Sequence, residues 1–343
     1  MALERALSVI KENGTVIVIT GLPQVSNAVS ECAKLAERDK ERVVIIGEPV
    51  AKNTAPAIAC ALAYSLAAGQ NRTMLVLTAD HIIEPLENFK ADAALAAAAA
   101  AEGKLAVFGI TPGRAETGYG YIETAGPGAA PPGAGAGGVL PVAAFREKPD
   151  LPTAQEFAVS GRHFWNSGMF AFDANFMLGE FSRHAADVLR PFEALKKPPG
   201  GAYAQVQGVK VLSWPGLETA YQNTKSISFD YAIAEKCAQT AMVRGSFNWV
   251  DIGNWEDYAR LRADAALRAN AAGGVEVFTA AAADCYVDSD IPVALAGVDD
   301  LIVVIRSGKN GEPAAALVTR KGQTQNVRDV VEAIKKSGRA DLL

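Results

Sequence analysis

The first 110 residues alternate between short β-branched runs and longer helical runs, and this alternation limits the fold more than any other feature. Amphipathic or alanine-rich stretches separate TVIVIT, RVVIIGE, TMLVLTA and LAVFGI, at residues 15–20, 42–48, 73–79 and 105–110. Short β-branched strands separated by helices indicate parallel strands that are joined by crossover helices. We therefore predict an α/β fold built on a doubly wound, mostly parallel sheet.

The pattern of predicted elements changes after Gly273 and Gly274, where helical runs are followed by short β runs and one final amphipathic helix. We therefore predict two domains, one at residues 1–262 and a small β-rich C-terminal domain at residues 275–343. A junction of this kind separates segments with their own hydrophobic cores.

Within the first domain, GYGYIET and VLPVAAFRE read as paired strands on either side of a loop at residues 126–138. Three glycines of this loop match the GxGxxG spacing. They follow prolines instead of a strand and open no helix, so we reject a dinucleotide-binding fingerprint.

Charge and hydropathy exclude several classes of partner. The chain of 343 residues has a formal net charge of −5, which gives no general attraction to nucleic acid or to anionic membranes. No apolar run approaches the roughly 20 residues of a membrane span. The four cysteines lie far apart without CxxC spacing, so we expect neither a zinc site nor disulfides. Reduced thiols indicate a cytoplasmic protein.

Two acids directly follow predicted strands. Asp80 lies in LTADHII, and Asp251 lies in NWVDIGNW before a helical run. Ligands of an open α/β sheet bind beyond the carboxyl ends of its strands, and a pair of carboxylates suits Mg²⁺. A helix N-cap or a solvated loop acid explains the position of Asp80 equally well.

Three further stretches carry candidate binding residues. In FREKPD, Lys148 can contact a phosphate and Glu147 can accept sugar hydroxyls, although a solvated turn is the commoner explanation. In WNSGMF, Asn166 can bridge a pair of hydroxyls or form an Asx cap. In EPVAKNTAPAI, Glu48 ends a strand and Thr54 is predicted to be a helix N-cap. The exposed N–H groups of that first turn also suit a nucleotide phosphate.

Taken together, these stretches resemble the bacterial mannose-1-phosphate guanylyltransferases, a group of sugar nucleotidyltransferases. Most of residues 1–262 is covered, in the order of the family, by EPVAKNTAPAIACA, LTADHII, FGITPGRAETGYGYIE, FREKPD, WNSGMFAF, SISFDYAIAEK and WVDIGNWEDY. The C-terminal segment resembles the short tail of the same family. The resemblance implies a Rossmann-like fold of the GT-A kind.

The resemblance also implies a reaction, in which GMP is transferred from GTP to mannose 1-phosphate to give GDP-mannose and pyrophosphate. Asp80 and Asp251 would hold the Mg²⁺ that bridges the phosphates, and Lys148 would contact the sugar phosphate. The positions implied for the hexose are Gly120, Glu147 and Asn166. The positions implied near the guanine nucleotide are Glu48, Asn53 and Thr54. The implied partners are GTP and mannose 1-phosphate, and a homodimer is left open.

One expected segment does not precede the matching runs. Members of the family begin with a strand and a Gly-rich loop that carries an arginine and holds the triphosphate, whereas this sequence starts at ALERALSVI, which resembles the next helix. We therefore expect an unfilled central position in the sheet. Two alternatives to the enzyme follow. One is a catalytically impaired relative that binds sugar phosphate or nucleotide sugar and regulates a partner. The other is a sibling transferase for another hexose 1-phosphate or nucleotide.

Overall fold

The computed structural model of the chain describes residues 2–67, 72–126, 138–195, 198, 202–259, 275–308, 314–339 and 342. These residues divide into two compact units, Met1–Trp249 and Val250–Leu343. The α/β class and the β-rich C-terminal region are confirmed. The predicted domain limits at residues 262 and 275 stay a prediction, because residues 260–274 lie outside the described residues.

Four strands form the first sheet of unit 1. Their order is β1, β2, β10 and β9, with the bounds Val16–Gly21, Val43–Glu48, Val209–Leu212 and Tyr203–Val206. β1 and β10 lie on either side of β2 and are parallel to it, whereas β9 is antiparallel to β10. The apolar run Val43–Ile46 of β2 is buried, as expected for a central strand that is covered on both faces.

Six strands form the second sheet. Their order is β3, β8, β5, β11, β7 and β6, with the bounds Thr73–Val76, His163–Asp173, Leu105–Ile110, Thr240–Arg244, Val139–Arg146 and Tyr121–Thr124. Of the described pairings in this sheet, only β5 with β11 is parallel. β1 and β3 each end a sheet, and both contribute side chains to the same core cluster. The strands predicted to form one sheet are therefore divided between two sheets that share a core.

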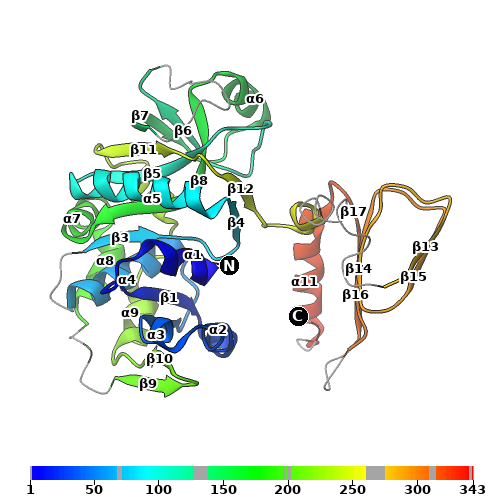
Figure 1. Cartoon of the computed structure of the whole chain (residues 1–343), viewed down its shortest axis with the longest axis horizontal. Coiled ribbons are helices and arrows are strands. Elements are labelled where there is room, and N and C mark those ends of the chain that lie inside the picture. The colour runs from blue at the N-terminus through cyan, green and yellow to red at the C-terminus, as the bar shows by residue number, and fades with distance from the viewer. Residues whose placement is uncertain are drawn as a thin grey trace. The chain divides into compact units, whose positions relative to one another are not determined.

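Helices cover both faces of the second sheet. Along β5, Leu105 and Val107 belong to one core cluster, whereas Ala106 and Phe108 belong to another, because successive side chains of a strand point to opposite faces. The second cluster includes the alanine-rich face of α5 (Leu86–Ala101), which lies across β5 and β8 in Figure 1. The first cluster includes α4, α7 and α8, with the bounds Thr54–Ala67, Ala174–His184 and Ala186–Glu193.

The remaining helical elements of unit 1 are short. They are α1 (Ala2–Val9), η1 (Leu22–Gln24), α2 (Val25–Cys32), α3 (Glu37–Lys40), α6 (Leu151–Val159), α9 (Leu217–Asn223) and the π-helical turn η2 (Asp230–Ala234). Within the described part of the chain, the helices are too short or too polar to cross a membrane.

Two local predictions have clear outcomes. The antiparallel pairing of β6 with β7 is confirmed, although most of the loop between them lies outside the described residues. The prediction of Thr54 as an N-cap is wrong, because α4 begins at Thr54 itself. The hydroxyl of Thr54 instead accepts a hydrogen bond from the backbone N–H of Phe229, at 2.8 Å.

A short strand that the sequence did not predict follows Asp80. This strand, β4 (His81–Glu84), pairs with β12 (Asn248–Asp251), which begins in unit 1. Four residues with polar ends give too short an alternation to be recognised as a strand.

Unit 2 is built mainly from strands. Parallel pairs form between β13 and β15 and between β14 and β16, and β17 is antiparallel to β16. In chain order, the strands are β13 (Val277–Ala280), β14 (Tyr286–Ser289), β15 (Val293–Ala296), β16 (Leu301–Arg306) and β17 (Ala315–Arg320). They are followed by the 3₁₀ turn η3 (Thr324–Asn326) and the helix α11 (Val327–Lys336). Ile302 and Val304 are buried together with Ala259 in the core of this unit.

Candidate functional site

Asp80 lies in the turn between β3 and β4, beyond the carboxyl end of β3. Its side chain is 65% exposed. The residue is followed by a strand, and the next helix, α5, begins only at Leu86. A helix N-cap is therefore excluded for Asp80, and the carboxylate is free to meet a ligand from solution.

His81 is held beside this carboxylate in a fixed orientation. Its Nδ1 accepts a hydrogen bond from the indole Nε1 of Trp249 at 3.0 Å, and the two rings meet edge-on with centroids 5.0 Å apart. Burial lowers the pKa of His81 to about 4, against the opposing effect of Asp80. The ring is therefore neutral at pH 7 and carries its proton on Nε2, which lies 3.9 Å from Asp80 Oδ1.

Asn166 lies at an irregularity of β8, next to the Asp80 turn. Its side-chain Oδ1 accepts a hydrogen bond from the N–H of Gly168 at 3.1 Å, and Gly168 has a positive φ of 67°. That conformation favours glycine because it has no Cβ. A Cβ at Gly168 would lie 3.8 Å from Thr78 Cγ2. The irregularity in β8 therefore contacts the segment that leads to Asp80.

Asp230 is a site residue that the sequence did not single out. Its Oδ1 accepts a hydrogen bond from the side-chain amide of Asn166 at 2.8 Å. Burial raises the pKa of Asp230 to about 6, and the charge of Glu147 adds to this, whereas Asn166 and Lys148 act in the opposite direction. A perturbed acid in contact with other polar groups is typical of functional sites. The available signal was an acid inside the apolar run of SISFDYAIAEK.

Gly120 allows Glu147 to approach the backbone. A Cβ at Gly120 would collide with Oε2 of Glu147, and the carbonyl of Gly120 accepts a hydrogen bond from the N–H of Asn166 at 2.8 Å. Lys148 places its Nζ 3.1 Å from Glu147 Oε1 and keeps 58% of its side chain exposed. The structure therefore brings three predicted hexose positions together, with Lys148 at their edge.

The predicted nucleotide segment joins this group through η2. In addition to the bond from Phe229 to Thr54, the N–H of Ala55 donates to the carbonyl of Ile227 at 3.2 Å. Asn53 has a positive φ of 73°, and its side chain accepts from the N–H of Thr54. The start of α4 is thus fixed against the segment that leads into Asp230.

Glu48 ends β2 and is half-buried. Burial raises the pKa of its carboxyl group. Its Oε1 accepts no hydrogen bond within the part of the chain that the structure describes. The hydroxyl of Tyr221 interacts with this carboxyl group and lowers its pKa, in opposition to burial.

Asp251 is the last residue of β12 and belongs to unit 2, whereas Asp80 belongs to unit 1. Their joint role in holding a metal stays a prediction. The local chain favours it, because Trp249, which is bonded to His81 beside Asp80, precedes Asp251 by two residues.

Comparison with known proteins places the chain in a family. The Nucleotidyl transferase family matches residues 6–267. Xanthan biosynthesis protein XanB of Xanthomonas campestris pv. campestris (strain B100) is 35% identical over 298 residues, which cover 87% of this chain and 58% of that protein. The mannose-1-phosphate guanylyltransferase of Escherichia coli (strain K12) is 35% identical over 311 residues, which cover 89% of this chain and 61% of that protein. The chain thus spans about three-fifths of the length of these relatives.

A solved structure from Thermus thermophilus, described as a mannose-1-phosphate geranyltransferase, has the same fold. The TM-score is 0.68 at 25% sequence identity, and the similarity covers 94% of this chain and 99% of that one. Since the family match extends over most of the sequence and includes the site in unit 1, the chain belongs to the nucleotidyl transferase family.

Proposed function

We propose that the chain transfers GMP from GTP to mannose 1-phosphate and releases pyrophosphate. The similarity to the E. coli guanylyltransferase supports this choice of substrates. The observation that carries the proposal is the polar cluster of Gly120, Glu147, Asn166 and Asp230, which lies beside the Asp80 turn. Glu147 directly follows β7, and Asp80 lies beyond the carboxyl end of β3, and ligands of an open α/β sheet bind beyond the carboxyl ends of its strands.

In the proposed reaction an oxygen of the sugar phosphate attacks the α-phosphorus of GTP. The bond from that phosphorus to the bridging oxygen breaks, and the electron pair leaves with pyrophosphate. The attacking phosphate is already anionic near neutral pH, so the protein needs to align the reactants and neutralise charge. The exposed ammonium of Lys148 contacts the sugar phosphate, and Glu147 and Asn166 bind the hexose hydroxyls.

We further propose that Asp80 and Asp251 hold a Mg²⁺ ion. The donor set fits this ion, because Asp80 offers an exposed carboxylate and the neighbouring His81 carries a proton on the nitrogen that faces it. The donors are then hard oxygens, which Mg²⁺ prefers over imidazole or thiolate. When bound, the ion supplies positive charge to the phosphates.

The nucleotide is assigned to the segment that contains Glu48, Asn53 and Thr54. The start of α4 is hydrogen-bonded to the segment that leads into Asp230, so a nucleotide bound there would lie next to the polar cluster. We assign the protein to the cytoplasm, where GTP is available, and this agrees with its four unpaired cysteines.

The direct test is release of pyrophosphate from GTP and mannose 1-phosphate in the presence of Mg²⁺, compared with ATP and UTP. Turnover that prefers GTP supports the proposal. Binding of GDP-mannose without turnover would show a binding protein, and faster turnover with ATP or UTP would show a sibling transferase.

Two variants test the assigned roles. Asp251→Ala is expected to abolish turnover while the protein stays folded, and a near-normal rate would remove Asp251 from the metal site. Lys148→Ala is expected to raise the KM for mannose 1-phosphate more than the KM for GTP. Lys104→Ala is the matched control, because Lys104 also pairs with a neighbouring glutamate, Glu102, at 2.7 Å but lies outside the proposed site.

A further inference from the structure

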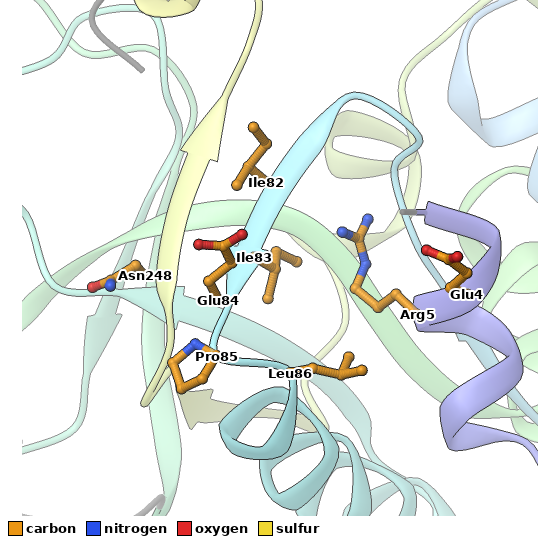
Figure 2. Close-up of a pocket in the computed structure, with 8 residues that line it drawn as sticks. All are labelled: Glu4, Arg5, Ile82, Ile83, Glu84, Pro85, Leu86 and Asn248. Carbon is orange, nitrogen blue, oxygen red and sulfur yellow. The ribbon is translucent and has the colours of Figure 1, made fainter. Parts of the chain in front are cut away.

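Arg5 reaches from α1 to the turn that carries Asp80. Figure 2 shows its side chain projecting from α1 toward β4, beside a groove of about 590 Å³. Its Nη2 donates to the carbonyl of Thr78 at 3.0 Å, and its Nη1 donates to the carbonyl of His81 at 3.0 Å. These two carbonyls lie on either side of Ala79 and Asp80. One planar guanidinium therefore clamps both ends of the turn.

The burial of this cation is unusual for an arginine in a small helix. Arg5 is only 4% exposed, and its Nε is buried without a hydrogen-bond partner. Among the described residues, no carboxylate forms an ion pair with it, and the guanidinium lies over the ring of Phe89, 5.9 Å from its centroid. A buried charge is costly, so the two charge-assisted bonds to the turn are the main interactions that offset this cost.

The turn is held from a second side by an aromatic pair. Trp249 donates to Nδ1 of His81, and this places the other nitrogen of His81 toward Asp80. The backbone around Asp80 is therefore fixed by Arg5 and the neighbouring ring by Trp249, whereas the Asp80 carboxylate itself stays exposed. An exposed ligand on a fixed backbone is the arrangement that preorganises a metal site.

We propose that Arg5 is a positioning residue for Asp80, which presets the carboxylate for a divalent cation without touching the cation or the substrate. This inference rests on the proposed metal-binding function of Asp80. Loss of groups that orient a metal ligand weakens metal binding by about 10- to 100-fold. Arg5→Met keeps the apolar stem of the side chain and removes both bonds, so it is the informative variant.

The test measures binding of Mn²⁺ alone to the full chain, by the loss of the free-ion signal in electron paramagnetic resonance. Asp80→Asn identifies the binding that depends on this carboxylate. Arg42→Met is the matched control, because Arg42 donates to the carbonyls of Lys11 and Ile10, at 2.6 and 3.5 Å, just beyond the other end of α1. Hydrogen exchange of the peptide that spans residues 77–84 reports on the turn itself, and Arg5→Lys carries the test if Arg5→Met does not fold.

The expected result is that Arg5→Met raises the Kd for Mn²⁺ at least about tenfold and speeds exchange in residues 77–84, while Arg42→Met changes neither. Arg5→Lys should restore part of the affinity. An unchanged Kd in Arg5→Met, or equal weakening in both methionine variants, would overturn the inference, as would a wild-type chain that binds no Mn²⁺. If the wild type binds Mn²⁺ and Arg5→Met weakens this binding, but GTP and mannose 1-phosphate yield no pyrophosphate, the proposed reaction fails and the role of Arg5 stands.

Discussion

Replacing Asp230 by asparagine should raise the free energy of unfolding relative to the wild type, by an amount that grows as the pH rises from 4 to 7. The carboxyl group of Asp230 is half-buried, and desolvation together with the charge of Glu147 raises its pKa from 3.8 to about 6. The folded state then binds more protons than the unfolded state between these values, so stability falls as the pH rises through this window. Asparagine keeps an oxygen that accepts the bond from Asn166 but carries no charge.

The magnitude follows from the size of the pKa change. A rise of about two pH units corresponds to about 3 kcal/mol, at about 1.4 kcal/mol per unit. Asp230 contributes this stability fully below pH 3.8 and loses it by the time the pH exceeds about 6. The free energy of unfolding of Asp230→Asn minus that of the wild type should therefore increase by about 3 kcal/mol between pH 4 and pH 7.

Urea unfolding, followed by tryptophan fluorescence at a series of pH values, measures this difference. Asp150→Asn is the control with the opposite sign, because hydrogen bonds from Thr153 lower the pKa of Asp150 at the start of α6. That variant should lose stability relative to the wild type as the pH rises. A difference for Asp230→Asn that is flat with pH, or that decreases, would refute the assignment of a half-buried acid with a raised pKa.

Three further changes have expected outcomes. Gly120→Ala places a methyl group against Glu147, so the KM for mannose 1-phosphate should rise while the KM for GTP stays the same; equal changes in steady-state kinetics would contradict this role. Phe89→Ala removes a fully buried ring packed against two other phenylalanines and should cost about 3–5 kcal/mol in urea unfolding, whereas a loss below about 1 kcal/mol would show a loose core. Trp249→Phe deletes the donor to His81 and should cost about 1–2 kcal/mol, and unchanged stability would show that this bond contributes nothing.

The order of strands and helices in unit 1 was largely predictable, but the pairing of the strands was not. β-branched runs show where a strand lies because they fit a pleated, half-buried surface. They carry no information about which strand lies beside which. The separation of β1 and β3 into different sheets depends on contacts between segments far apart in the sequence, and these become visible only in the structure.

The positions of candidate site residues were predictable where an exposed polar group follows a strand, as for Asp80 and Lys148. Arg5 and Asp230 were missed for a common reason. In ALERALSVI and SISFDYAIAEK each is a charged residue within a predicted helical stretch, and periodicity assigns such residues to the solvent face. Periodicity shows which residues share a face of a helix, but it does not show whether the polar face meets solvent or a site.

Asp80 and Asp230, both in unit 1, have opposite environments, and this difference suits them to different tasks. Asp80 is exposed on a backbone that is clamped by Arg5, so it can bind a cation at little desolvation cost. Asp230 is half-buried and accepts a hydrogen bond from the amide of Asn166, so it can orient that amide. This difference favours Asp80 as the carboxylate of the proposed metal site and Asp230 as a partner of the groups that are proposed to hold the sugar.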